Sequence, residues 1–412
     1  MSARLRFLAL ITADISSALG SRISLVAIPW LVLELHGSAA DMGYVAAAEM
    51  VPYLLTSMFL TPVADWFGLR RSSAFCDAVS AVAVATIAAF PHTGMGMLLL
   101  LVAVAGALRG VGDRTKHVLL KPAAVAAGYS MIRVTSLYEG LTRLATLLGA
   151  PLGGLLIVWC GARGSVWVDA ASFGLCALLV VVAVAPAAAP SDAVVREPYL
   201  TALLGGIRYL RDDRVLSMML TTVFFLNFFA NAATLVFLPL WAKDVLHSPE
   251  ALGLALGVFA AGALIGTVLF TLVSEKLPQY PAFLVGALVS GAPRLFAVGW
   301  SSNEAVVLVV SAISGFAIAS VNPILGVAMY ERIPDALQTR VIGLCTTVCF
   351  LGIPIGAVIG GWSVGAFGLR PTLMGAGVLC LLVNLVPFVD RRPVELKPAV
   401  VPLLDPEPVQ QL

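Results

Sequence analysis

The sequence predicts an all-α membrane protein with twelve transmembrane helices in two six-helix, pseudo-symmetric halves. Of its 412 residues, 60% are hydrophobic and only 12% are charged, whereas about 25% of the residues in a soluble domain are charged. Six apolar runs, each of the roughly 20 residues that span a bilayer, precede a polar segment, and six more follow it. A glycine-proline motif in the fifth run returns about 200 residues later, in the eleventh.

The apolar runs divide the chain into four segments. The N-terminal half, residues 1–189, holds runs at 7–35, 43–64, 72–91, 95–112, 132–159 and 165–189. The C-terminal half, residues 215–389, holds runs at 215–240, 251–273, 281–300, 304–329, 337–365 and 370–389. Residues 190–214 are expected to form a cytoplasmic linker with an amphipathic helix, because leucines recur there at helical spacing beside arginines. Residues 390–412 are rich in proline and charge, which predicts a disordered tail.

The first apolar run is longer than the h-region of a signal peptide, so we expect an uncleaved first helix. Basic residues predict the orientation of the spans, because cytoplasmic loops carry an excess of lysine and arginine. The alternate connections carry only Arg163, Lys243 and Arg370, while the other connections and both ends of the chain carry the remaining basic residues outside the spans. Both termini are therefore expected in the cytoplasm, with the chain crossing the cell membrane many times.

The glycine-proline motif is a predicted helix-packing motif. Small residues let membrane helices approach closely, and proline removes a backbone hydrogen bond and bends a helix. We expect these residues to control how the fifth span packs and bends as the two halves move. The motif consists of Gly140, Gly149, Pro151, Gly153 and Gly154, with Gly343, Gly352, Pro354 and Gly356 as its second copy.

Further landmarks repeat between the halves. Gly161-Ala-Arg163 follows the fifth run, and Gly368-Leu-Arg370 follows the eleventh. Gly43 and Asp65 bound the second run as Gly253 and Glu275 bound the eighth. Parallel repeats of this kind are typical of transporters that rock two halves about a site near the bilayer midplane.

The loop from Thr61 to Arg71 resembles the loop signature of the major facilitator superfamily, Gly-x-x-x-Asp-Arg-x-Gly-Arg-Arg. Asp65, Gly68 and Arg70 match it, and three positions depart from it: Thr61, Trp66 and Leu69. Gly68 would permit the tight turn. The resemblance implies that this gating loop, namely Asp65, Gly68, Arg70 and Arg71, latches the two halves on the cytoplasmic side.

A second resemblance points to export. The stretch from Gly140 to Gly154 resembles the antiporter motif of the superfamily's drug-efflux branch, with its proline one residue late. The chain is most similar to macrolide-type and siderophore exporters in three stretches: Asp113-Arg-Thr-Lys, Trp167-Val-Asp-Ala-Ala-Ser-Phe173 and Arg211-Asp-Asp213. The resemblance implies the major facilitator fold, in which spans 1, 4, 7 and 10 line the cavity and spans 3, 6, 9 and 12 are outer supports.

Ionisable side chains inside a bilayer are costly and are functional candidates. Uphill export needs an energy source, and a carboxyl group in a dry cavity can carry a proton between the two sides. The candidates for proton coupling are Asp14, Glu49 and Glu139. The arginines proposed for the substrate cavity are Arg22, Arg109 and Arg143. Groups on the implied outer supports are expected to form structural pairs instead: Asp77, Asp169 and Arg294.

Two pairs of these groups lie four residues apart, so that each pair shares a helix face: Arg109 with Asp113, and Glu139 with Arg143. Their spacing is compatible with a four-group cluster between spans 4 and 5. A neutralised structural network is the alternative interpretation.

The second half offers aromatic and amide side chains, which suit large amphipathic organic molecules. The candidates for its substrate cavity are Asn227, Phe228 and Asn231 in span 7 and Asn322 in span 10, where Asn322-Pro323 interrupts the run. Phenylalanines that face lipid are the alternative interpretation.

The sequence disfavours other classes of function. It shows no phosphate-binding loop, nucleophile-base set or metal-ligand cluster, so we expect no enzyme activity, no cofactor and no metal. A net charge of +2 argues against a nucleic-acid partner. The expected partners are a small-molecule substrate, a proton and the lipid bilayer, with the chain acting as a monomer.

We therefore predict a secondary active transporter that exports a hydrophobic or amphipathic small molecule, such as a drug or antibiotic, in exchange for protons. Uptake or lipid translocation is the alternative within transport. A transporter-shaped sensor or scaffold is the alternative of another class, which the short loops disfavour.

Overall fold

The computed structural model describes residues 2–35, 37–60, 67–90, 94–183, 213–333 and 335–389, and these residues are helical almost throughout. The first part of the chain forms α1 (Ala3–Leu35), α2 (Ala39–Phe59), α4 (Leu69–Ala89), α5 (Met95–Ala126) and α6 (Met131–Ala183). The second part begins with α8 (Arg214–Ala232), the short π-helix η1 (Ala233–Phe237), α9 (Leu238–Trp241), the short π-helix η2 (Ala242–Leu246) and α10 (Pro249–Val273). It continues with the 3-10 turn η3 (Ser274–Lys276), α11 (Gln279–Trp300), α12 (Glu304–Ile318), α13 (Val321–Arg332), α14 (Asp335–Phe367) and α15 (Leu369–Val389).

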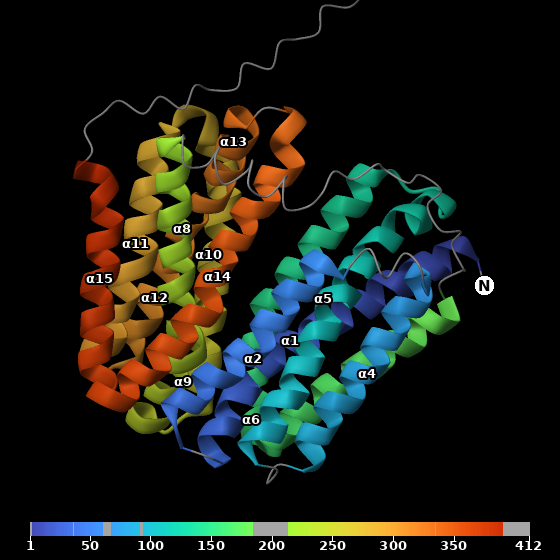
Figure 1. The fold of residues 1–412 in the computed structure, drawn as a ribbon, viewed down its shortest axis with the longest axis horizontal. Helices are drawn as coiled ribbons and strands as arrows, with labels where there is room; N and C mark the ends of the chain where they lie inside the picture. The colour runs from blue at the N-terminus through green and yellow to red at the C-terminus, as the bar shows by residue number, and fades with distance from the viewer. Residues whose placement is uncertain are drawn as a thin grey trace, which may run out of the picture.

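The helices gather into two groups (Figure 1). Helices α1 to α6 lie together on the right of the view, and α8 to α15 lie together on the left. The groups meet towards the bottom and splay towards the top. Two crossings join them, because α2 packs along α14 and α6 packs along α10.

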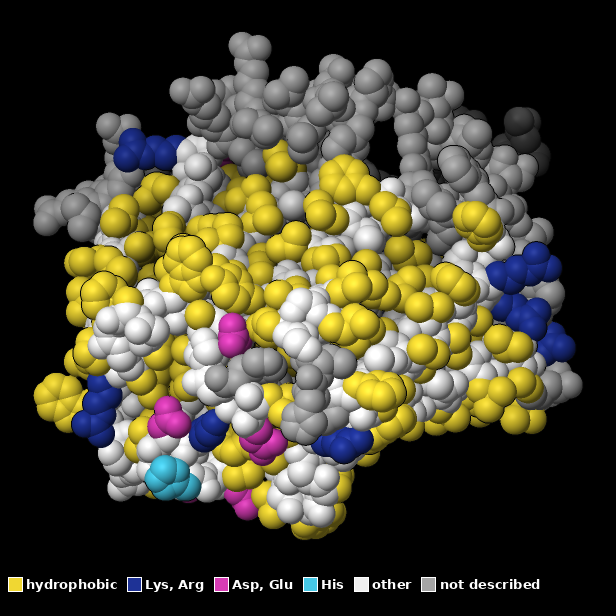
Figure 2. Space-filling model, turned by 60° about the horizontal axis from the view of Figure 1, so that its bottom comes forward, with side chains coloured by type: hydrophobic (Ala, Val, Ile, Leu, Met, Phe, Trp, Pro, Cys, Tyr) yellow, Lys and Arg dark blue, Asp and Glu magenta, His cyan; other side chains and the backbone are white. Residues whose placement is uncertain are grey.

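Ten of the described helical segments are long and apolar enough to cross a membrane. Helix α2 is not among the ten, and it carries Asp41 and Glu49 within its 21 residues. Hydrophobic side chains also dominate the surface, and the charged side chains on the visible face stand in small separate groups (Figure 2). Such a surface suits burial in lipid.

Local features repeat between the two groups, as the sequence predicts. Gly161 inside α6 and Gly368 between α14 and α15 both adopt the left-handed region, with φ of 74° and 84°. Glycine adopts this region without strain, so each ends one helix and lets the next turn back. Ser38 and Ser248 likewise cap α2 and α10 by accepting the amide N–H three residues on, at 3.4 and 3.3 Å.

The break in α6 lies at Gly161, whereas Pro151 stays inside a continuous helix. The interruption predicted near Asn322-Pro323 is confirmed, since α12 ends at Ile318 and α13 begins at Val321. Gly68, with φ of 84°, makes the turn into α4 that the sequence predicts.

Helix α5 differs most from its prediction. Its apolar run was expected to end at residue 112, but the helix continues to Ala126. Arg114, Lys116 and Lys121 therefore belong to a helix and not to a loop, and Lys116 is buried. The charged residues between 113 and 121 end the run of high hydropathy. Leu119 and Leu120, within this stretch, are nevertheless buried in the helix bundle.

Several predicted segments fall outside the described residues. These are Asp65 in the gating loop, the tail 390–412 and the linker 190–214 except for its last two residues. Of those two, Asp213 caps α8 by accepting the N–H of Leu216 at 3.0 Å. Asp213 also pairs with Arg332 of α13 at 3.0 Å, which ties the start of α8 to that helix.

Candidate functional site

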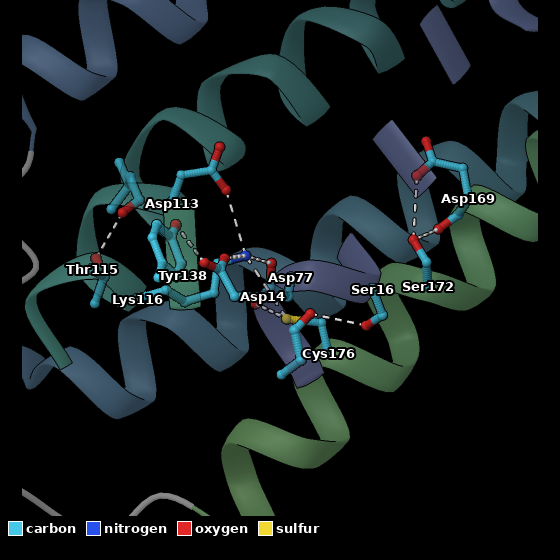
Figure 3. Close-up of polar contacts among 12 residues, drawn as sticks. Asp14, Ser16, Asp77, Asp113, Thr115, Lys116, Tyr138, Asp169, Ser172 and Cys176 are labelled. Atoms are coloured by element: carbon cyan, nitrogen blue, oxygen red, sulfur yellow. Dashed lines mark hydrogen bonds and ion pairs between the residues drawn. The ribbon is translucent and has the colours of Figure 1, made fainter. Parts of the chain in front are cut away.

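A buried lysine organises a cluster of charges in the first helix group (Figure 3). Lys116 of α5 is 2% exposed. Its Nζ lies 3.3 Å from Oδ1 of Asp77 on α4 and 3.5 Å from Oδ1 of Asp14 on α1. Asp113, one turn earlier on α5, lies 3.5 Å away at its own Oδ1. Four charged side chains from three helices thus converge on one point.

The charges of this lysine cluster do not balance, since one ammonium faces three carboxyl groups. Asp77 is 3% exposed, while the side chains of Asp14 and Asp113 are 14% and 40% exposed. Excess negative charge away from water is costly, and binding a proton relieves it. Two of the three carboxyl groups can still exchange protons with solvent.

Polar neighbours extend the lysine cluster to α6. The hydroxyl of Tyr138 donates a hydrogen bond to Oδ2 of Asp14 at 2.7 Å. The thiol of Cys176 donates to Oδ2 of Asp77 at 3.2 Å. Protonation at Asp14 or Asp77 would therefore alter bonds that hold four helices together.

A second charged site joins α2 and α5. Arg109 Nη1 lies 2.5 Å from Oε1 of Glu49, and the guanidinium carbon lies 5.7 Å from the centre of the Tyr53 ring. Both side chains of the ion pair are partly exposed, at 21% and 24%. Gly106 makes this approach possible, because an added Cβ there would lie 3.0 Å from the carbonyl carbon of Glu49.

This pairing corrects one prediction from helix spacing. Arg109 and Asp113 share a helix face, yet Arg109 pairs with Glu49 and Asp113 lies beside Lys116. The side chain of Glu139 lies outside the described residues, and Arg143 bonds to Thr267 of α10 at 3.4 Å. The described part of the chain therefore shows no four-group cluster between spans 4 and 5. Because α2 and α5 pack closely, the carboxyl group of Glu49 on α2 lies closer to Arg109 than the carboxyl group of Asp113, one turn along α5.

A second fully buried carboxyl group, after that of Asp77, is bonded to hydroxyl groups. Asp169 is 2% exposed and accepts a hydrogen bond from Ser24 of α1 at 2.5 Å. Gly20 makes room for it, because an added Cβ there would lie 2.6 Å from Asp169 Oδ1. The predicted role of Asp169 as a structural group fits this arrangement, which holds α1 against the second segment of α6.

The loop residues that follow Asp65 lie at the start of α4. Arg70 donates a hydrogen bond to the carbonyl of Val181 on α6, and Arg71 is exposed. Among the described residues, no ion pair joins either arginine to the second helix group, so the latch between halves stays a prediction.

A cavity of about 580 Å³ lies between the two helix groups. Its walls include Tyr53, Ser57 and Arg114 from the first group, and Tyr330 and Thr346 from the second. Glu49 and Arg109 lie one turn from this wall, since Tyr53 contacts Arg109. We call this end of the interface the open end.

The opposite end of the interface is closed. Lys243 of η2 donates a hydrogen bond to the carbonyl of Leu33 on α1 at 2.6 Å. Trp362 of α14 donates to the hydroxyl of Tyr44 on α2 at 2.7 Å. The backbones also touch, because a Cβ added at Gly43 would lie 3.0 Å from Cα of Val358. We call this end the closed end.

The glycine motif packs the same pair of helices in each group. A Cβ added at Gly153 of α6 would lie 3.1 Å from the carbonyl oxygen of Ile23 on α1. A Cβ added at Gly356 of α14 would lie 2.9 Å from Cα of Phe228 on α8. Gly149 packs on Arg22 and Gly352 on α8 in the same way. Both motif copies therefore pack closely on the neighbouring helix at these four glycines.

The same motif reaches across the interface at Gly154, whose added Cβ would lie 3.2 Å from Cα of Gly253 on α10. The ring of Pro151 likewise packs on Gly257. Gly140 and Gly343 lie in a more open place, where an added Cβ would meet no described atom within 4 Å. Gly343 lines the interface cavity instead.

A second cavity, of about 320 Å³, lies inside the second helix group between α8, α10, α11, α12 and α13. Asn227, Asn231 and Asn322 line it, as the sequence predicts for a cavity in this half. Phe228 is not among its lining residues, and the backbone of Phe228 packs on Gly352 and Gly356 of α14. Arg294 of α11 also lines it, and the structural partner predicted for this arginine is not found among the described residues.

Comparison with known proteins assigns the class. The fold matches a mutant of the nucleoside transporter NupG with a TM-score of 0.81, over 94% of this chain and 100% of that chain at 12% identity. It matches a bacterial homologue of the human lysosomal transporter Spinster, solved in an inward-facing and unoccupied conformation, with a TM-score of 0.72. That match covers 93% of this chain and 95% of the homologue at 15% identity. These two likenesses show the fold class, an all-helical membrane fold that this chain shares with solved transporters.

Within this class, the chain belongs to the transmembrane secretion effector family, whose model matches residues 3–404. The multidrug efflux pump Tap of Mycobacterium tuberculosis is 29% identical over 384 residues, which are 91% of this chain and 90% of Tap. The superfamily and the transporter function predicted from the sequence are confirmed.

Sequence reasoning missed three members of the lysine cluster: Lys116, Tyr138 and Cys176. A signal existed for the first of them. Asp113 and Lys116 are three residues apart and share a helix face if the helix continues past residue 112.

Proposed function

We propose that this protein is a proton-coupled exporter of a hydrophobic or amphipathic small molecule, acting as a monomer in the cell membrane. Its twelve spans form two halves, residues 1–189 and 215–389, joined by the cytoplasmic linker 190–214 and followed by the cytoplasmic tail 390–412. Counting α2 as a span, and α6 as two spans divided at Gly161, brings the first half to six. The matching glycine contacts in the two helix groups support this symmetry.

The interface supports transport by alternating access. With both termini in the cytoplasm, the open end of the interface faces the cytoplasm and the closed end faces outward. The cavity of about 580 Å³ at the open end falls in the range of ligand sites, about 300–1,000 Å³. It combines aromatic rings with hydroxyl groups, which suits amphipathic molecules. Multidrug efflux by Tap, a full-length relative, supports export as the direction.

The lysine cluster carries the proposal of proton coupling, because Lys116 faces three carboxyl groups within 3.5 Å. In the outward-facing state, Asp14 would bind a proton from the outer side of the membrane. The change to the inward-facing state would then expose this proton to the cytoplasm. Asp14 can release it to solvent in the state described here, where its side chain is 14% exposed. Glu49 and Glu139 are the remaining carboxyl candidates, and Glu49 already has a single balancing charge in Arg109.

Transport in proteoliposomes tests the proposal. Wild-type protein should pump a lipophilic fluorescent dye uphill when a proton gradient is imposed, and should also exchange dye downhill without a gradient. Asp14→Asn removes the proton carrier, so uphill pumping should fall about tenfold or more while downhill exchange persists. Asp244→Asn, at an exposed aspartate of η2, is the matched control.

Three outcomes decide between the parts of the proposal. No dye movement by the wild type with any of several lipophilic dyes would argue against drug-like substrates. Gradient-independent pumping would argue against protons as the energy source. Normal uphill pumping by Asp14→Asn would move the proton site to Glu49 or Glu139, where Glu49→Gln and Glu139→Gln repeat the test.

A further inference from the structure

Arg294 is a buried cation, and two nitrogen atoms of its guanidinium group lack acceptors among the described residues. It lies on α11, is 4% exposed, and belongs to the wall of the 320 Å³ cavity inside the second helix group. Its Nε and Nη2 atoms are buried and bond to no acceptor among the described residues. No described carboxyl group forms an ion pair with it. A buried arginine almost always has such a partner, because an unpaired charge away from water is expensive.

An aromatic ring supplies only part of what the cation needs. The guanidinium carbon lies 4.6 Å from the centre of the Phe259 ring on α10. The face of an aromatic ring attracts a cation at this distance. The ring is no hydrogen-bond acceptor of the kind that the guanidinium N–H groups need, so Nε and Nη2 still lack acceptors.

Three polar groups of the helices around Arg294 donate their hydrogen bonds elsewhere. Pro293 has no amide N–H, which frees the carbonyl of Val289, and the hydroxyl of Ser314 donates to that carbonyl at 3.4 Å. Ser290 donates to the carbonyl of Ala287 at 3.2 Å, and Asn227 donates to the carbonyl of Cys349 at 2.9 Å. These three groups therefore give Nε and Nη2 of Arg294 no acceptor.

We propose that this cavity binds the anionic group of an amphipathic small molecule, a carboxylate in its simplest form, with Arg294 as the counter-ion. This inference rests on the proposed function and specifies a substrate class for it. Nε and Nη2 share one edge of the guanidinium, and a carboxylate satisfies two such donors at once. The long side chain can turn this edge towards an anion that enters the cavity.

The rest of the cavity suits the body of such a molecule. Its volume of about 320 Å³ holds a fused two-ring compound, at the lower limit of the usual ligand sites of about 300–1,000 Å³. Leu226, Phe229 and Leu295 provide apolar walls, and Asn322, which is exposed, lies at its edge. An anionic lipid headgroup carries similar charge, but the cavity lies among five helices, which favours a free carboxylate compound.

Binding of matched probes tests the inference. The full chain, in nanodiscs of phosphatidylcholine alone, is titrated calorimetrically with 2-naphthoate and with 2-naphthamide, which differ mainly in the negative charge. Wild-type protein should bind naphthoate about tenfold or more tightly than naphthamide. Arg294→Gln should abolish this preference without changing naphthamide affinity, and Arg294→Lys should retain part of it. Arg370→Gln, an exposed arginine of the same helix group, should bind as the wild type does.

Additional variants and membrane compositions distinguish the possible outcomes of this binding experiment. If Arg294→Gln does not fold, Ala230→Leu narrows the cavity while keeping the charge and should weaken both probes. Loss of naphthoate binding only in nanodiscs containing phosphatidylglycerol would assign the cavity to lipid and overturn the inference. So would equal binding of the two probes by the wild type, or wild-type preference in Arg294→Gln. Because no gradient is present, carboxylate-selective binding without uphill dye export would contradict the proposed function alone.

Discussion

The ammonium group of Lys116 lies 3.3 Å from the carboxyl group of Asp77, and both residues are at most 3% exposed. One belongs to α5 and the other to α4, so the pair joins two helices inside the first group. Asp14 and Asp113 contribute two more carboxyl groups, and among the described residues Lys116 is the cation that lies within 3.5 Å of all three.

Replacing Lys116 by methionine should destabilise the protein strongly. Removing one partner of a buried ion pair costs about 3–5 kcal/mol, because the remaining charge is left uncompensated. The expected result is a clear fall in the melting temperature of purified protein, measured by tryptophan fluorescence in detergent. Lys116→Arg keeps the charge and should retain most of the stability.

The double variant Lys116→Met with Asp77→Asn separates charge from packing. Neutralising one buried carboxyl group should restore part of the stability lost in the single variant, since the excess negative charge falls. A melting temperature of Lys116→Met equal to that of the wild type would contradict the structural role of the cluster.

The sequence predicts the helices well, because a bilayer demands long apolar runs and every backbone group must be bonded within the span. Hydropathy does not predict burial where a charged side chain is buried against side chains of opposite charge. The prediction for α5 therefore stops at residue 112, and Lys116 is counted as a loop residue. Its contact with Asp77 depends on how α4 and α5 pack, which no local pattern encodes.

The sequence predicts several individual residues of the candidate site, but it does not predict which of them pair with one another. Asp14, Glu49 and Arg109 stand out because they are ionisable inside apolar runs. The choice of Glu49 over Asp113 as partner of Arg109 follows from the close α2–α5 approach at Gly106. For Arg294 the expectation of a partner was reasonable, and its absence among the described residues becomes visible only in three dimensions.

Gly153 tests the packing role of the glycine motif. Leucine there would push against the backbone of α1, because even an added Cβ would lie 3.1 Å from the Ile23 carbonyl oxygen. Overpacking of this kind costs about 1–3 kcal/mol and should block movement of α6 against α1. Gly153→Leu should therefore lose dye transport in vesicles at an unchanged level of inserted protein.

Gly140→Leu is the matched control, since an added Cβ at that glycine of the same helix would meet no described atom within 4 Å. It should transport at the wild-type rate. Transport by Gly153→Leu at the same rate as by this control would remove the packing role from the motif.

The orientation can be checked directly. A reporter that works only in the cytoplasm, fused after Leu412, should be active, and the same reporter inserted at His247 should be inactive. His247 lies between η2 and α10 with φ of 54°, at the end of the span that starts with α8. Equal activity at both positions would contradict the proposed number of spans or their direction.

Lys243 holds the closed end of the interface, so its removal should favour opening there. Its ammonium group donates to the Leu33 carbonyl across the two helix groups at 2.6 Å. A hydrogen bond from a charged donor contributes about 1.5–3 kcal/mol, which corresponds to roughly a tenfold or larger shift between two states. Lys243→Met should therefore raise amide hydrogen exchange in residues 37–44 and 357–361, where the backbones of α2 and α14 touch.

Lys276→Met is the matched control. It removes an exposed charge in η3, which follows α10 at the end remote from Pro249, and it should leave that exchange unchanged. Unaltered exchange in Lys243→Met would mean that the glycine contacts alone keep this end closed.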